Sequence, residues 1–233
     1  MSELEVTRLR TGGSGRLPAE EAARLPDRLL DAATAMFLAH GYAKASMEAI
    51  ARAAGASTKT IYSRYRNKDE ILAATIRRMV DRTLPPLLEE LENDADTTEP
   101  RTLLATIAAR LVTLVTTEDV LGIFRLVIAE SPRFPELSRL STEGPGRAIG
   151  FLGRLFERWH RSGQLRVAPT PDKLLARLFF DMTVTTPRNR AAVGRPLSRA
   201  ELDVHVAAAV DLFWRAYGVD EGSAGRRRTN ARR

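Results

Sequence analysis

The stretch from Ser46 to Leu72, SMEAIARAAGASTKTIYSRYRNKDEIL, restricts the fold more than any other part of the sequence. It predicts a short helix, a tight turn and a second short helix that leads directly into a third. Ser46 is placed to cap the first helix, whose apolar residues recur at helical spacing: Met47, Ile50, Ala51 and Ala54. Gly55 follows where a left-handed cap favours a residue without a β-carbon, and Ser57 can cap the second helix. This is the helix-turn-helix layout, whose second helix enters the major groove of DNA.

Positive charge and hydroxyl groups concentrate on the second of these helices. Between Gly55 and Lys68 there is no acidic residue, and four cations are present: Lys59, Arg64, Arg66 and Lys68. Hydroxyl-bearing side chains lie among them: Thr58, Thr60, Tyr62 and Ser63. Cations and hydroxyls bind phosphate, whereas side chains near the N-terminus of such a helix reach base edges. The pattern predicts a DNA-binding surface, and an amphipathic helix pair with a solvated basic face is the alternative.

Residues from about 29 to 72 resemble the DNA-binding domain of the TetR family of bacterial transcriptional regulators. The matching pieces are AATAMFLAHGYAKASMEAIARAAGAS and KTIYSRYRNKDEIL. The family typically shows an aromatic-glycine-aromatic run, a capping Ser or Thr, and an I/LY-x-aromatic-F-x-x-K-x-x-L ending. The sequence departs from this pattern at His40-Gly41-Tyr42, where Glu-Gly-Phe is commoner, and at Tyr65, where phenylalanine is usual. Both departures nearly conserve side-chain volume, so the fold is expected to be the same.

Position on the second helix predicts a role for each candidate DNA-binding residue. Lys59 and Thr60 lie near the helix tip and are expected to contact bases. Thr58 and Ser63 are expected to contact both bases and phosphates. The residues that flank the helix are expected to bind phosphate: Ser46, Tyr62, Arg64 and Lys68. Ile50, Ile61 and Tyr65 are expected to form the small core of this domain.

The composition is typical of a soluble globular protein that works in a reducing compartment. The chain has 233 residues, a net charge of +7 and no cysteine. No window approaches the ~20 apolar residues that a membrane helix needs, and the N-terminus lacks the apolar core of a signal peptide. A cytoplasmic protein without a membrane partner is therefore expected. Five of the arginines lie in the last eight residues, so most of the net charge belongs to a basic tail.

Enzymatic function is not predicted. The three histidines, His40, His160 and His205, are far apart and lack the spacing of a metal site. Neither a nucleophile elbow nor a phosphate-binding loop occurs, and no cofactor or metal is expected. An enzyme of unknown chemistry is a remote alternative. The stronger alternative is a helical DNA-binding protein with little sequence preference and no ligand.

Helical periodicity continues through the remainder of the chain and predicts an all-α protein with two domains. A flexible arm (1–25) precedes the three-helix DNA-binding domain (26–72), whose first helix is expected at 27–40. A larger helical regulatory and dimerisation domain (73–218) and a basic disordered tail (219–233) follow. Within the larger domain, helices are expected at 103–115, 121–130, 174–182 and 201–217. Pro85-Pro86 is expected to bend or interrupt a long helix from Lys68, and Gly144-Pro145-Gly146 to break or kink another that ends near Gly163.

The C-terminal part, through the segment RLVIAESPRFPELSRLSTEGPGRAIGFLGRLFERWHRSGQL, is similar to the TetR subgroup of AefR-like repressors. The resemblance implies a homodimer on a palindromic operator, with LLARLFFDMTVTT and LDVHVAAAVDLFWRAYG packed against the partner's equivalents as a four-helix bundle. It also implies an unknown small-molecule inducer that releases DNA. Candidate ligand-binding residues are Phe124, Arg125, Phe151, Trp159 and Phe180. Ordinary core packing is the favoured alternative for these aromatic residues, and a solvated face or an ion pair is an equal alternative for the arginine.

Overall fold

The computed structural model describes residues 19–166 and 170–219, which form ten α-helices and one isolated antiparallel bridge between Leu165 and Gly218. The helices are α1 (Ala19–Lys44), α2 (Met47–Ala53), α3 (Thr58–Arg64), α4 (Lys68–Asp94), α5 (Pro100–Val115), α6 (Glu118–Glu130), α7 (Pro135–Leu140), α8 (Glu143–Arg161), α9 (Asp172–Ala192) and α10 (Arg199–Tyr217). The all-α prediction is confirmed. Most of the predicted arm (1–18) and nearly all of the predicted tail (220–233) lie outside the described residues.

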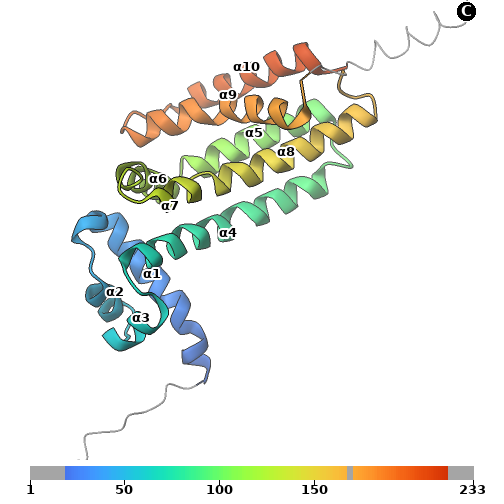
Figure 1. Cartoon of the computed structure of the whole chain (residues 1–233). Helices are drawn as coiled ribbons and strands as arrows, with labels where there is room; N and C mark the ends of the chain where they lie inside the picture. Colours follow the sequence, from blue (N-terminus) through green and yellow to red (C-terminus); the bar gives the residue numbers. More distant parts are fainter. Residues whose placement is uncertain (1–18, 167–169, 220–233) are drawn as a thin grey trace, which may run out of the picture.

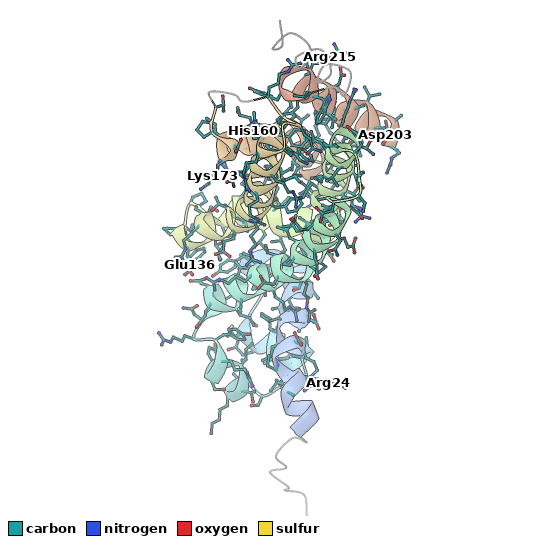
Figure 2. All side chains as sticks on the ribbon, turned by 90° about the vertical axis from the view of Figure 1, so that its right-hand side faces the viewer. Arg24, Glu136, His160, Lys173, Asp203 and Arg215 are labelled. Carbon is teal, nitrogen blue, oxygen red and sulfur yellow. The ribbon has the colours of Figure 1, made fainter. Side chains whose placement is uncertain are left out.

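The helices form an elongated molecule with a small head and a larger body. Helices α1–α3 make the head at one end, and α4 runs from the head along the body formed with α5–α10 (Figure 1). Figure 2 shows Arg24 of α1 and Arg215 of α10 at opposite ends of the molecule. Among the described helices, none is both long and apolar enough to cross a membrane.

The head has an apolar core that continues into the body. Ile50 of α2 and Ile61 of α3 are fully buried, as predicted, against Phe37 of α1. The same cluster includes side chains from α4, α6 and α7: Ile71, Leu72, Ile76, Ile123, Leu126, Val127, Leu137 and Leu140. The predicted boundary at residue 72 therefore does not separate two cores.

The second core fills the body and is rich in aromatic rings. Phe156, Phe179 and Phe213 come from three helices, and the Phe156–Phe213 and Phe179–Phe213 ring centroids are 4.9 and 5.0 Å apart. Trp159 stacks on Phe156 at 5.9 Å. Aromatic pairs at these separations stabilise a core beyond the area they bury. These contacts fix α8, α9 and α10 against one another.

The first helix starts earlier than predicted. α1 begins at Ala19, and Leu25 is only 5% exposed within the head core, so the segment 19–25 is not a flexible arm. Burial of Leu25 stabilises helix on the N-terminal side of Pro26, which the local sequence did not suggest. At the other end, Gly41 has a non-helical conformation (φ 72°, ψ 171°) at the predicted stop.

Prolines interrupt the helices less than predicted. α4 continues through Pro85 and Pro86, which are both exposed, so the carbonyl groups that lose a donor can bond to water. Pro145 lies in the first turn of α8, where a missing N–H leaves no helical bond unmade, and the break falls earlier, at 141–142. α9 extends ten residues beyond the predicted end at Met182 because Val184, Pro187 and Ala191 are buried.

Candidate nucleic-acid interface and an apolar cavity

The turn between α2 and α3 is fixed by caps on both sides. The Ser46 hydroxyl accepts a hydrogen bond from Ala49 N at 3.1 Å and starts α2. Gly55 is left-handed (φ 66°) and donates its N–H to Arg52 O, while Ala56 N donates to Ala51 O at 2.8 Å. These two bonds form a Schellman cap, as a glycine at this position predicts.

Helix α3 buries one side chain and exposes most of the others. The Ser57 hydroxyl accepts from Thr60 N at 3.1 Å, and Ile61 is fully buried in the head core. Because Ile61 fixes the rotation of the helix, the side chains around it face outward. The exposed ones are Thr58, Lys59, Tyr62, Ser63 and Arg64.

The predicted DNA-binding residues of α3 differ in how far they are already hydrogen-bonded. Thr58, Lys59 and Arg64 form no side-chain hydrogen bond or ion pair with the described part of the chain. The Thr60 and Ser57 hydroxyls share a bond of 2.7 Å, and the Ser63 hydroxyl donates to Thr60 O at 2.8 Å. Lys59 and Arg64 therefore remain available to an external partner.

Tyr62 is bonded across the motif to α2. Its hydroxyl donates to Glu48 Oε1 at 3.0 Å, and its ring is 45% exposed. The pKa of the Glu48 carboxyl is lowered, first by a hydrogen bond from its own backbone and then by Tyr62. A carboxylate thus lies on the same surface as the cations, which the sequence analysis did not take into account.

Lys68, which is predicted to bind phosphate, is hydrogen-bonded within the head. Its ammonium group donates to the carbonyl oxygens of Tyr42, Ala43 and Ala45 at 2.7, 3.3 and 3.0 Å, and lies 4.2 Å from the centroid of the Tyr42 ring. Three bonds use all the protons of an ammonium group. Lys68 therefore joins the end of α1 to the start of α4.

An apolar cavity of about 130 Å³ lies in the body next to the head. Its walls come from α4, α5, α6, α8 and α9, together with the end of α7 and Ser141, which follows it. Two of the predicted ligand-binding residues, Phe124 and Phe180, line it. Most of the other lining residues are aliphatic: Ile76, Met79, Val80, Leu84, Leu111, Leu114, Val115, Val120, Ile123, Val127, Leu140 and Ala148.

The other three predicted ligand-binding residues lie elsewhere. Phe151 and Trp159 are 1% and 2% exposed and belong to the body core, as the packing alternative expects. Arg125 is outside the cavity, where it donates to the carbonyl oxygens of Ala191 and Ala192 and pairs with Glu118 at 2.9 Å. It joins α6 to the end of α9.

Arg188 of α9 is a cavity residue that the sequence analysis missed. Among the described residues of the cavity wall, it alone is charged. It lies four and eight residues after Val184 and Phe180, which places it on the buried face of the helix. That spacing was visible in the sequence, but the predicted helix ended at Met182 and left Arg188 outside it.

Taken together, the capped turn, the exposed cationic face of α3 and the adjoining helical body define a helix-turn-helix DNA-binding protein with a second, cavity-containing domain. Family models agree with both parts of this architecture. The model described as bacterial regulatory proteins of the tetR family matches residues 29–75, and the model described as the C-terminal domain of AefR-like transcriptional repressors matches residues 102–219.

Solved structures agree over most of the chain. A TetR-family transcriptional regulator from Mesorhizobium loti is 29% identical and has a TM-score of 0.78, covering 85% of this chain and 98% of its own. SmeT in complex with triclosan is 25% identical (TM-score 0.62; 84% of this chain, 93% of that chain). The flavonoid-responsive regulator FrrA is 24% identical and has the same fold (TM-score 0.66; 84% and 98%). No curated protein matches at a significant level.

The chain belongs to the TetR family of transcriptional regulators. It is a DNA-binding regulator whose C-terminal domain is of the AefR-like type.

Proposed function

We propose that this protein is a homodimeric repressor that binds a palindromic operator through α3 and is released by a small molecule in the body cavity. The observation that carries the proposal is the outward face of α3, where Lys59 and Arg64 have no partner in the described part of the chain. In this proposal residues 26–72 bind DNA, and residues 73–218 dimerise and bind the ligand.

The proposed contacts follow position on the helix. Lys59 and Thr60 contact bases, and Thr58 and Ser63 contact bases and phosphates. Ser46, Tyr62 and Arg64 bind phosphate from the edges of the motif. Specific contacts of this kind come from side chains near the start of the recognition helix, whereas flanking contacts fix its position on the duplex.

An exposed apolar face on α9 and α10 supports the dimer. Large aliphatic side chains on these helices are between half and three-quarters exposed: Leu174 (50%), Leu178 (54%), Val204 (70%) and Leu212 (62%). Several large exposed apolar side chains on neighbouring helices favour an interaction site over a solvated surface. Twofold pairing of this face presents two α3 helices to DNA, and such a dimer requires a palindromic site.

The position of the cavity supports release by a ligand. Ile76 of α4 and Ile123 and Val127 of α6 line the cavity and also belong to the head core. A ligand that shifts α4 or α6 therefore changes how the head packs on the body. Release requires that the ligand bind the non-DNA-binding arrangement more tightly. SmeT, whose structure contains triclosan, supports a small-molecule ligand for this cavity.

Selection of bound sequences from a random duplex pool tests the proposal. Salt titrations then compare the selected duplex with a scrambled duplex. For a specific dimeric regulator, we expect the selected duplex to be palindromic and to bind roughly a thousandfold or more tightly than the scrambled duplex. Equal affinities with equal salt dependence would show that the cations bind only phosphate. The chain would then be a DNA-binding protein with little sequence preference.

A further inference from the structure

We propose that the cavity binds a small organic monocarboxylate, whose carboxylate pairs with Arg188 and whose apolar body fills the space between α4, α6 and α8. This inference deepens the proposed ligand-regulated function and names the class of ligand. It rests on the position of one cation in an otherwise apolar wall.

Arg188 is partly buried, and its guanidinium packs on an aromatic ring without an anionic partner among the described residues. Its guanidinium carbon lies 4.4 Å from the centroid of the Phe124 ring, and its Nε is buried without a hydrogen bond. Within the described residues, Arg188 forms no ion pair or hydrogen bond with any other group. The carboxylate of Asp181, two turns earlier on α9, lies 3.6 Å from Arg177 instead.

Placing a guanidinium in this wall is unfavourable without an anion. Burial lowers the pKa of Arg188, and the charge of Asp181 opposes that shift only from a distance. An arginine nevertheless stays charged in a protein, so its buried, unbonded Nε keeps a desolvation cost until an anion binds beside it. A carboxylate can accept two parallel N–H bonds from the planar guanidinium, and a desolvated site strengthens both.

The charge of the cavity selects a monoanion. Arg188 is balanced by one negative charge, and a dianionic phosphate would leave a second charge in apolar surroundings. Both hydroxyl groups in the wall already donate their proton to a backbone carbonyl. Thr83 donates to Met79 O at 2.8 Å, and Ser141 donates to Ser138 O at 2.7 Å. Neither competes with Arg188 for the carboxylate, and an ammonium ligand would meet an uncompensated cation.

The size of the cavity limits the apolar body. Its volume of about 130 Å³ is close to that of an apolar cavity of ~150 Å³ that accommodates benzene. A single aromatic ring or a short acyl chain fits this space. Aromatic and aliphatic acids share the required chemistry, so the experiment has one arm for each.

Calorimetric titration of the full-length protein tests the ligand class. The probes are octanoate and phenylpropionate as acids, octanamide as the matched neutral molecule, octylamine as the matched cation, and acetate as a carboxylate without an apolar body. We expect one or both acids to bind at least tenfold more tightly than octanamide, with no binding of octylamine or acetate. Equal affinity for octanoate and octanamide would overturn the proposal, as would the absence of acid binding at about millimolar concentration.

Variants of α9 test the assignment of the charge. Arg188→Gln is expected to weaken acid binding roughly ten- to a hundredfold, the range of a charge-assisted hydrogen bond, while Arg188→Lys retains part of the affinity. Arg190→Gln is the matched control, because Arg190 lies on the same helix, is exposed and does not line the cavity. Unchanged acid affinity in a folded Arg188→Gln protein would refute the role of Arg188.

A separate measurement of operator binding distinguishes this inference from the proposed function. If acids bind through Arg188 and release operator DNA, the ligand class and the proposed release by a ligand are both supported. If they bind through Arg188 and leave the operator complex intact, the ligand class stands and release by this ligand fails.

Discussion

At the scale of single residues, Lys59 and Arg64 offer a direct comparison on one helix. Both are exposed on α3, but Lys59 lies in its first turn and Arg64 in its last. We expect Lys59→Ala to change which sequences are preferred. Arg64→Ala should weaken all sequences alike and lower the salt slope by about one unit. Binding titrations on the selected operator and on single-base variants measure both effects, and a uniform loss in both variants would refute the division of roles.

Lys68 is expected to act on stability and not on sequence preference. Lys68→Ala removes the donor shared by three carbonyl groups at the junction of α1 and α4. Loss of charged hydrogen bonds of this kind costs about 1–3 kcal/mol. Chemical denaturation should therefore give a lower free energy of unfolding, with little change in the salt slope of DNA binding for the protein that remains folded. A lower slope with unchanged stability would restore the phosphate-binding role.

These two lysines illustrate what the sequence could predict about the site. Periodicity and charge placed both on the DNA-binding motif, but they could not tell a cation that faces solvent from one that binds backbone carbonyls. The carbonyls belong to residues 42–45, more than twenty positions away, and only the folded chain brings them to Lys68. The same limit applies to Arg188, whose significance depends on helices that enclose it from distant parts of the chain.

At the scale of helices, the sequence predicted helix ends correctly where a capping residue determines them. The side chains of Ser46 and Ser57 both accept the capping bonds that their positions predict. Ends decided by tertiary packing were missed. α1 begins eight residues before the predicted start because Leu25 is buried in the head, and α9 continues past Met182 because its later residues are buried in the body.

A change at the contact between α1 and α6 tests whether this contact determines the position of the head on the body. A β-carbon added at Gly122 of α6 would overlap Leu38 Cδ2 of α1. Gly122→Ala is therefore expected to force the Leu38 side chain to move, loosen the contact between α1 and α6, cost up to about 1 kcal/mol of stability and reduce operator affinity. Denaturation and operator titration measure the two quantities.

The matched control for this change is Gly146→Ala in α8, where an added β-carbon meets no atom within 4 Å. Adding Leu38→Ala to Gly122→Ala should recover operator affinity, because it removes the side chain that the new methyl group displaces. Unchanged operator affinity in Gly122→Ala would mean that the α1–α6 contact does not set the position of the head.

At the scale of the whole molecule, the helices shared by the head core and the cavity wall explain how a body cavity can influence a distant surface. α4 and α6 contribute side chains to the head core and to the cavity wall. A movement of either helix at the cavity therefore also changes the packing of the head core. Packed cores respond to such changes by shifting between discrete arrangements. A ligand near Arg188 and the DNA-binding face of α3 are thus connected through the two helices that contribute to both the head core and the cavity wall.

Dimerisation determines whether two such heads act together. Leu212→Glu places a charge on the exposed apolar face of α10, where pairing with a second copy would bury it at a cost of several kcal/mol. We expect a folded monomer in sedimentation measurements at micromolar concentration. Its operator affinity should be at least a hundredfold weaker, because the second head no longer binds at high effective concentration. Ile128→Glu is the control, since Ile128 is similarly exposed (58%) but lies on α6. A Leu212→Glu protein that remained dimeric would place the interface on another face, whereas a monomer with full operator affinity would show that one head is sufficient for recognition.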